Sequence, residues 1–225
     1  MKTLIIGYGF TGRSLHKLLP KADIADIKPP NSAIMKFDCN NQDYWNILAS
    51  YDAVVFTCEL SSIEDSSKLA SILKSKKIII LSTAKSYKVD KVNELITESS
   101  PLNANHRTKS EEAFINTADI LCLALIWGYE RSPEKWLKSG KITNGNKFVN
   151  FIHVDDLCKI ITLCLKNKKP AGRILISDGK PEIWQTIADK YSILLPSKEC
   201  GKESKKLSNK KLLSLLPDNF KFKVP

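Results

Sequence analysis

Hydrophobic residues along the chain fall into short apolar runs that alternate with amphipathic stretches. The runs have the length of buried strands, and the stretches between them repeat their apolar positions at helical spacing. The expected strands are 3–6, 22–27, 33–37, 53–58, 77–82 and 120–127. The expected helices between them are 10–19, 43–49, 66–74 and 103–116. This alternation predicts an α/β fold with a doubly wound parallel sheet that helices cover on both faces.

The pattern becomes less regular after about residue 128. The expected elements there are helices at 133–139, 155–165, 181–191 and 210–215 and strands at 147–152 and 173–177. The polar segment 83–101 and most of the basic tail after residue 196 carry no expected element. We therefore expect a core domain over residues 1–128 and a small C-terminal lobe over residues 129–225.

The 225 residues have the composition of a soluble globular protein, with 43% hydrophobic and 26% charged residues. The net charge of +11 comes mainly from lysines spread along the chain, without a basic stripe interleaved with aromatic residues, which argues against nucleic acid as the partner. No apolar run is long enough to cross a membrane or to form a secretory signal, so we expect a cytoplasmic protein. The six cysteines form no CxxC pair and the three histidines are scattered, so no metal site is expected.

A glycine-rich motif follows the first expected strand and opens the first expected helix. The motif has the form G-x-G-x-x-G and consists of Gly7, Tyr8, Gly9, Phe10, Thr11 and Gly12. Gly7 permits a tight turn, Gly9 lets a pyrophosphate approach the backbone, and Gly12 lets the helix lie close to the strand. The first turn of the helix offers free N–H groups to an anion. The sequence therefore predicts a dinucleotide-binding site of the Rossmann type.

Acidic residues near the ends of the second and third expected strands indicate which dinucleotide binds. Asp26 stands 19 residues after Gly7, where a carboxylate accepts hydrogen bonds from the ribose hydroxyls and repels a 2′-phosphate. This position favours NAD over NADP, although Lys28 is close enough to contact a 2′-phosphate. Asp23 is the competing acid if the strand is shifted. Asp38 is placed to contact the adenine side of the cofactor, or else only forms a turn.

Several segments resemble the extended short-chain dehydrogenase/reductase superfamily, in particular its NAD-dependent epimerase/dehydratase branch. They are spread over essentially the whole chain, at residues 7–12, 37–38, 81–87, 98–102, 126–128, 151–157 and 177–181. The segment F-I-H-V-D-D-L at 151–157 is the most specific of them. The short chain and its tail look most like the atypical compact members that resemble nucleoside-diphosphate-sugar epimerases.

The resemblance implies a chemistry and a set of site residues. Family members use a tyrosine and a lysine one helical turn apart, where the tyrosine exchanges a proton with the substrate oxygen and the lysine holds the nicotinamide ribose. The resemblance places that lysine at Lys109 and the hydroxyls that orient the substrate at Ser82 and Thr83. The end of the fourth strand, Thr57 and Cys58, is expected to contact the cofactor.

The tyrosine of this pair is missing from its expected position. Asn105 stands four residues before Lys109, and an amide cannot donate and recover a proton near neutral pH. Three interpretations remain open. Tyr87 turns into the site, His106 takes over the proton transfer, or the protein does not perform the redox chemistry of the family.

The sequence thus predicts an NAD(P)-binding protein similar to sugar-nucleotide epimerases and dehydratases. It is expected to act as an oxidoreductase or epimerase on a hydroxyl or carbonyl group of a small-molecule substrate, for which a nucleotide-sugar is one candidate. The alternative is a dinucleotide-binding sensor or scaffold without catalysis. An oligomer is compatible with the sequence, whereas a membrane partner is not expected.

Overall fold

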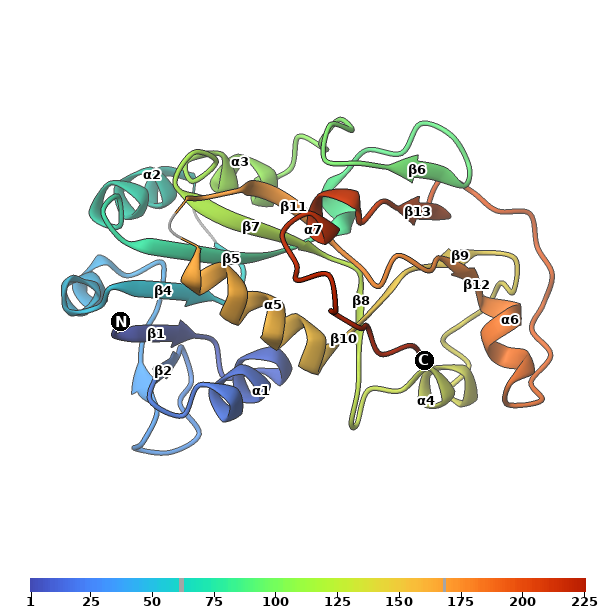
Figure 1. Ribbon diagram of the computed structural model, residues 1–225, viewed down its shortest axis with the longest axis horizontal. Coiled ribbons are helices and arrows are strands. Elements are labelled where there is room, and N and C mark those ends of the chain that lie inside the picture. Colours follow the sequence, from blue (N-terminus) through green and yellow to red (C-terminus); the bar gives the residue numbers. More distant parts are fainter. Residues whose placement is uncertain (61–62, 168) are drawn as a thin grey trace. The chain divides into compact units, whose positions relative to one another are not determined.

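A seven-stranded sheet forms the centre of the fold in the computed structural model, which describes residues 1–60, 63–167 and 169–225 (Figure 1). Its strand order is β11-β7-β5-β4-β1-β2-β3. The strands are β1 Thr3–Ile6, β2 Asp23–Asp26, β3 Met35–Lys36, β4 Ala53–Phe56, β5 Lys77–Thr83, β7 Ala118–Leu123 and β11 Gly172–Ile176. The predicted doubly wound α/β fold is confirmed.

The strand order reverses beside β1, which has β2 on one side and β4 on the other, both parallel to it. All side chains of β1 and β4 are buried, as expected for strands covered on both faces. Open α/β sheets bind ligands outside the carboxyl ends of their strands at such a switch point. This topology therefore directs attention to the segments that follow Ile6 and Phe56.

The remaining elements are helices and short strands, which lie between the strands of the central sheet along the chain and after the last of them. The helices are α1 Phe10–Leu18, α2 Ile63–Ile72, α3 His106–Glu112, α4 Pro133–Lys138, α5 Val154–Lys166, α6 Trp184–Asp189 and α7 Lys210–Leu213, with 3-10 turns at η1 Gln42–Ser50 and η2 Ala84–Ser86. The short strands are β6 Glu94–Ile96, β8 Leu125–Trp127, β9 Phe148–Val149, β10 Phe151–His153, β12 Glu182–Ile183 and β13 Lys205–Leu207.

The chain divides into two compact units that are interleaved along the sequence. The first unit comprises residues 1–86, 103–122 and 158–174, and the second comprises 87–102, 123–157 and 175–225. The second unit contains three strand pairs, β8 with β10, β9 with β12, and β6 with β13. An aromatic cluster forms part of its core, where the Trp184 ring meets the rings of Trp136 and Phe151 edge to face. The domain boundary that we expect at residue 128 stays a prediction.

Three expected elements differ from the observed ones because tertiary contacts divide or shorten them. The expected strand 147–152 is divided into β9 and β10, which belong to different sheets. The expected strand 120–127 is two strands in different sheets, since the Ala124 N–H donates to Ile176 O and the next N–H, of Leu125, donates to Asn150 O. The expected helix 103–116 is limited to α3, because Asn105 caps it and turns follow Glu112.

The expected loop 83–101 and the basic tail each contain a strand that the sequence pattern does not predict. β6 in the loop pairs with β13 in the tail in parallel, and Leu95 is opposite Lys206. Each strand has only three residues, which is too short for a recognisable alternation of apolar and polar positions. The expected helix 181–191 likewise begins as the strand β12 before it becomes α6.

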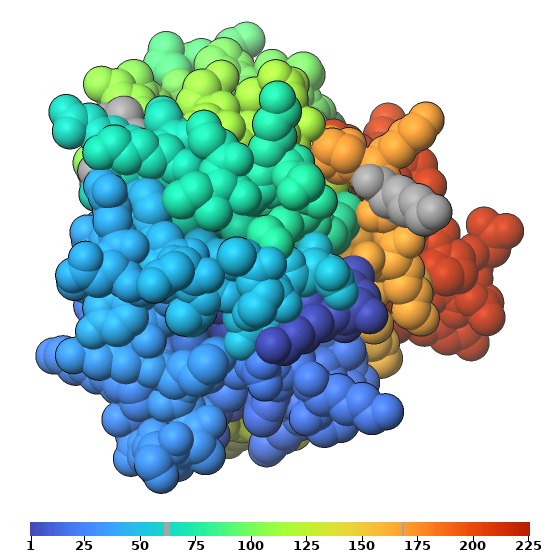
Figure 2. All heavy atoms as spheres, turned by 90° about the vertical axis from the view of Figure 1, so that its left-hand side faces the viewer, coloured from blue at the N-terminus to red at the C-terminus, as the bar shows by residue number. Residues whose placement is uncertain are grey.

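Figure 2 looks onto the side of the molecule where β1 begins, opposite the end to which β1 points in Figure 1. Residues of the first unit, coloured blue to teal, are in view there. No helix in the described part of the chain is long and apolar enough to span a membrane.

Candidate functional site

The glycine-rich turn follows β1 at the switch point of the sheet. Gly7 has a φ of +109°, a conformation that side chains other than glycine rarely adopt, and its N–H donates to Ala25 O of β2 at 2.8 Å. A Cβ atom at Gly7 would also collide with Thr57 Oγ1. Both the backbone conformation and the space available therefore require glycine at this position.

The other two glycines of the motif have opposite surroundings. A Cβ atom at Gly12 would lie 1.8 Å from the carbonyl oxygen of Gly7, so only glycine lets α1 approach the turn this closely. A Cβ atom at Gly9 would have no atom within 4 Å, and φ at Gly9 is an ordinary −76°. Gly12 is thus required by the protein itself, whereas the backbone at Gly9 borders open space.

The first turn of α1 is open to an anion. Gly9 is the N-cap residue, no side chain caps the helix, and the first turn contains no acidic residue. The first N–H groups of a helix have no partner within the helix and carry a partial positive charge. Together with the open backbone at Gly9, this arrangement fits the pyrophosphate of a dinucleotide.

Thr57, at the end of β4, supports the turn from the neighbouring strand. Its hydroxyl oxygen lies 3.0 Å from both Ile6 O and Gly7 O, and it donates to these carbonyl groups. This contact holds the end of β1 in place across 50 residues of sequence. The sequence predicts Thr57 as a cofactor contact, and the structure adds a role for its hydroxyl in positioning the turn.

Asp26 at the end of β2 is tied to the same turn. One carboxylate oxygen accepts the Tyr8 N–H at 2.6 Å, and the other accepts the Lys28 N–H at 2.9 Å. Each carboxylate oxygen can accept a further hydrogen bond, so these contacts leave room for ribose hydroxyls. The competing acid, Asp23, instead accepts from the Tyr51 hydroxyl at 2.8 Å. The structure thus brings Asp26 rather than Asp23 to the glycine-rich turn.

Two cysteines lie between the predicted adenine contact, Asp38, and the end of β4. The Asp38 carboxylate accepts the Asn40 N–H at 2.9 Å, which is the turn-forming arrangement. The Cys39 thiol hydrogen-bonds to the sulfur of Cys58, and both residues are half-buried and free of disulfides. This hydrogen bond lowers the pKa of Cys58 and raises the pKa of Cys39, because the Cys39 S–H stabilises a thiolate at Cys58.

We expect Cys58 to be alkylated by iodoacetamide faster than Cys39 at neutral pH, since the thiolate is the nucleophile. Replacing Cys39 with alanine removes the hydrogen bond, so it should raise the pKa of Cys58 and slow this reaction. Cys39→Ser keeps a donor and is the matched control. Mass spectrometry of the modified peptides over a pH series measures both rates. Equal rates at Cys58 in the alanine and serine variants would contradict this explanation.

The predicted orienting hydroxyls lie at the end of β5. Ser82 is buried, and its hydroxyl has no hydrogen-bond partner in the described part of the chain. Thr83 is half-buried, and its Oγ1 accepts the Lys85 N–H at 3.2 Å, which leaves its own O–H group available as a donor. The structure therefore places a hydroxyl donor at the carboxyl end of a central strand.

The helix that carries Asn105 and Lys109 has a different construction from the one that the family resemblance implies. Asn105 is the N-cap of α3: its side chain accepts the Thr108 N–H at 3.0 Å, and the Thr108 hydroxyl accepts the Asn105 N–H. Lys109 is exposed in the last turn of this short helix. The residue at the position of the missing tyrosine thus has a structural role, which its spacing from Thr108 in the sequence could have indicated.

Of the two replacements considered for the tyrosine, His106 lines a pocket together with Thr83 among the residues that the structure describes. Tyr87 is 1% exposed, forms a bridge with Leu102 and belongs to the second unit. His106 is exposed at the start of α3. The geometry of the first unit therefore favours His106 over Tyr87 as the partner of Thr83.

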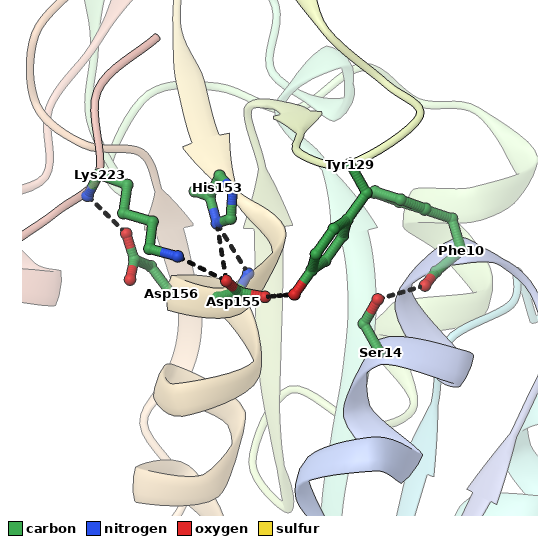
Figure 3. Close-up of polar contacts among 7 residues, drawn as sticks. All are labelled: Phe10, Ser14, Tyr129, His153, Asp155, Asp156 and Lys223. Atoms are coloured by element: carbon green, nitrogen blue, oxygen red, sulfur yellow. Dashed lines mark hydrogen bonds and ion pairs between the residues drawn. The ribbon is translucent and has the colours of Figure 1, made fainter.

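The second unit holds a polar network around the start of α5 (Figure 3). The Asp155 carboxylate accepts from the Tyr129 hydroxyl at 2.8 Å and from Lys223 Nζ at 2.6 Å, while the Asp156 carboxylate accepts the Lys223 N–H. Burial alone would raise the pKa of Asp155, but the hydrogen bonds from Lys223 and Tyr129 lower it below its ordinary value. His153 Nδ1 accepts the Asp155 N–H. The two acids thus attach the C-terminal segment to α5, a role for Lys223 that the sequence pattern does not indicate.

A second acid in this unit, Asp178, has a perturbed pKa. Burial raises the pKa of Asp178 to about 6, and the charge of Glu182 adds to the shift. One oxygen of each of these two carboxylates is buried without a hydrogen-bond partner among the described residues. The described residues contain no group of three or more side chains that could hold a metal ion.

Comparison with solved structures shows what shares this fold. WbmG of Bordetella bronchiseptica, solved with NAD, is 19% identical, with a TM-score of 0.77 over 100% of this chain and 90% of that one. A short-chain dehydrogenase/reductase superfamily protein of Agrobacterium tumefaciens with bound NAD is 12% identical, with a TM-score of 0.77 over 100% and 93%. UDP-glucuronic acid 4-epimerase of Bacillus cereus, in complex with NAD, is 19% identical, with a TM-score of 0.71 over 96% and 90%.

The sequence alone does not reveal these similarities to a direct search. No protein-family model matches the chain, and no curated protein matches it significantly. The chain nevertheless has the fold of NAD-dependent epimerases and of the short-chain dehydrogenase/reductase superfamily over nearly its full length.

Proposed function

We propose that this protein binds NAD(H) over residues 7–12 and acts on a hydroxyl or carbonyl group of a small-molecule substrate. The observation that carries the proposal is a contrast within the turn. At Gly12 the protein's own backbone occupies the space where a side chain would stand, whereas Gly9 borders open space in front of an uncapped helix. Three neighbours in fold are solved with NAD, which supports the same cofactor here.

The residues present assign distinct roles to parts of the site. The N–H groups at the start of α1 would hold the pyrophosphate, and the Asp26 carboxylate would accept from the ribose hydroxyls. When bound, the nicotinamide ring supplies hydride transfer. The Thr83 hydroxyl would donate a hydrogen bond to the substrate oxygen, and the His106 imidazole would exchange the proton with that oxygen.

A non-catalytic dinucleotide sensor is the second candidate. Two observations favour it: the Asn105 side chain caps α3, and Lys109 is exposed instead of facing the pocket that Thr83 lines. The tyrosine of the family's usual mechanism therefore has no equivalent at position 105, where Asn105 stands. The two candidates share NAD binding and differ only in turnover.

Calorimetric titration of the purified protein with NAD, NADH and NADP tests the shared part. Saturable binding of NAD(H) is expected, and the absence of binding for all three compounds would exclude both candidates. UDP-glucuronic acid, the substrate named for the Bacillus cereus epimerase, is then added to the NAD complex. The appearance of NADH absorbance would support an enzyme, and its loss in His106→Asn would support the proton-transfer role.

We expect the Asp26 carboxylate to determine the preference of the protein for NAD over NADP. We expect Asp26→Asn to reduce the preference for NAD about tenfold or more, because the change removes the charge that repels a 2′-phosphate while it keeps an oxygen that can accept hydrogen bonds. Asp23→Asn is the matched control, since Asp23 is engaged with Tyr51. Affinities for both cofactors measure the ratio, and an equal ratio in the two variants would show that Asp26 does not contact the ribose.

A further inference from the structure

A small pocket opens between the ends of β4 and β5 and the start of α3. Its volume is about 220 Å³, enough for a few non-hydrogen atoms. It is lined by Glu59, Thr83, Lys85, Ser86, Asn105, His106 and Arg107. All of these residues belong to the first unit, and all but Thr83 and His106 lie outside the residues that the sequence indicates as catalytic candidates or as cofactor contacts.

The pocket has an excess of cationic groups. Lys85 is exposed, and its ammonium group has no ion pair or hydrogen bond with the residues that the structure describes. Arg107 donates to Glu59 at 2.6 Å and keeps further N–H groups, since a guanidinium has five. Glu59 is the only acid among the lining residues. Two cations therefore face one carboxylate, before His106 is counted.

A buried hydroxyl in the pocket wall also lacks a partner. Ser86 is 1% exposed, and its Oγ forms no hydrogen bond with the described residues. The Ser86 carbonyl, by contrast, accepts the Asn103 N–H, so the backbone here is held in place. A buried polar group without a partner is unfavourable, and a ligand that accepts its proton would remove that cost.

We propose that this pocket binds a compact oxyanion, a carboxylate or a phosphate group, carried by the substrate. Lys85 and Arg107 supply the charge, and the hydroxyl groups of Thr83 and Ser86 supply hydrogen bonds. The identity of the ligand as the substrate rests on the proposed function, because Thr83 is shared by the pocket and the proposed reaction site. The substrate is then a hydroxy or carbonyl compound with an acid group near the reacting carbon.

Amide NMR of the apoprotein tests the pocket without turnover. The probes are glycolate, glycerol 1-phosphate and the uncharged ethylene glycol, at constant ionic strength. Saturable shifts at residues 83–86 and 106–107 are expected with at least one of the two anions and not with ethylene glycol. A response to glycolate alone assigns a carboxylate, and a response to glycerol 1-phosphate alone assigns a phosphate. No response to either anion would overturn the proposal.

Charge variants distinguish binding in the pocket from a general effect of net charge. Lys85→Gln is expected to raise the dissociation constant of the responding anion about tenfold, the loss that one charge-assisted hydrogen bond causes. Lys74→Gln is the matched control, since Lys74 is an exposed lysine outside the pocket. Equal effects of the two substitutions would overturn the proposal.

The ion pair of Arg107 with Glu59 offers a test in which two variants have opposite signs. Arg107→Gln should weaken anion binding, because it removes a donor and leaves the Glu59 carboxylate unneutralised. Glu59→Gln should strengthen it at least about twofold, because it removes the only acid and frees Arg107. If the ion pair were purely structural, both variants would bind the anion more weakly than the unchanged protein, and that result would contradict the proposal.

The same samples are titrated with NAD to separate this proposal from the proposed function. NAD binding without any anion response would overturn the pocket alone. An anion response without NAD binding would support the anion-binding pocket and exclude the dinucleotide site.

Discussion

Replacing Gly9 with valine is expected to lower the affinity for NAD at least about a hundredfold while the protein stays folded. The valine side chain would occupy the open space in front of the α1 N-terminus, which no neighbouring atom of the described residues fills within 4 Å. Excluding the pyrophosphate removes two or more hydrogen bonds to a charged group, each worth about 1.5–3 kcal/mol, and every 1.4 kcal/mol is about tenfold in affinity.

The fold should tolerate this change because Gly9 has an extended conformation that valine adopts readily. The expected loss of stability is about 1 kcal/mol or less, the cost of a poorer N-cap residue. Calorimetry with NAD and thermal unfolding measure the two effects. Leu18→Val places the same side chain at an exposed position of α1 and serves as the control. Unchanged NAD affinity in Gly9→Val would refute the pyrophosphate assignment.

Replacing Gly12 with alanine is expected to have the opposite profile, with a loss of stability of about 3 kcal/mol or more. The added methyl group would lie 1.8 Å from the Gly7 carbonyl oxygen, so α1 would have to move away from the turn. The two nearest atoms, O and C of Gly7, belong to the backbone and cannot rotate aside, and the third is Thr57 Oγ1 at 3.1 Å. The strain therefore falls on the packing of α1 against β1.

Denaturant and thermal unfolding of Gly12→Ala and Gly9→Ala, compared with the unchanged protein, test this expectation. For a chain of this length the Gly12 variant should melt roughly 6–12 °C lower, whereas Gly9→Ala should melt within a few degrees of the original. Equal stability of the two variants would mean that the close approach of α1 to the turn does not hold in solution. The pair thus separates a glycine that the fold needs from one that a ligand needs.

The glycine-rich turn was predictable because its physical requirements are local. A strand, three glycines and a helix follow one another within a few residues. Gly7 and Gly12 have steric reasons within the protein, whereas Gly9 borders open space. The position of Asp26 beside the turn was also predictable, because neighbouring parallel strands bring their carboxyl ends together. The roles assigned to Ser82, Thr83, Lys109 and Tyr87 stay predictions, and of these four residues the described pocket lining includes Thr83.

Other features depend on contacts between distant segments and were not predictable. The Arg107–Glu59 ion pair joins residues 48 positions apart, and Lys223 meets Asp155 across 68 positions. Nothing in the local pattern around these residues identifies the partner. The hydrogen bond between Cys39 and Cys58 is of the same kind, since neither cysteine stands in a motif.

The sequence by itself determined the class of fold and the glycine-rich turn, because hydrophobic periodicity and glycine spacing act over a few residues at a time. Only the tertiary structure decided that Asn105 caps a short helix, that β6 and β13 pair, and that Lys85, Ser86 and Arg107 share one pocket. Those outcomes depend on which distant backbone groups and charges meet when the chain collapses. A one-dimensional pattern does not contain that information.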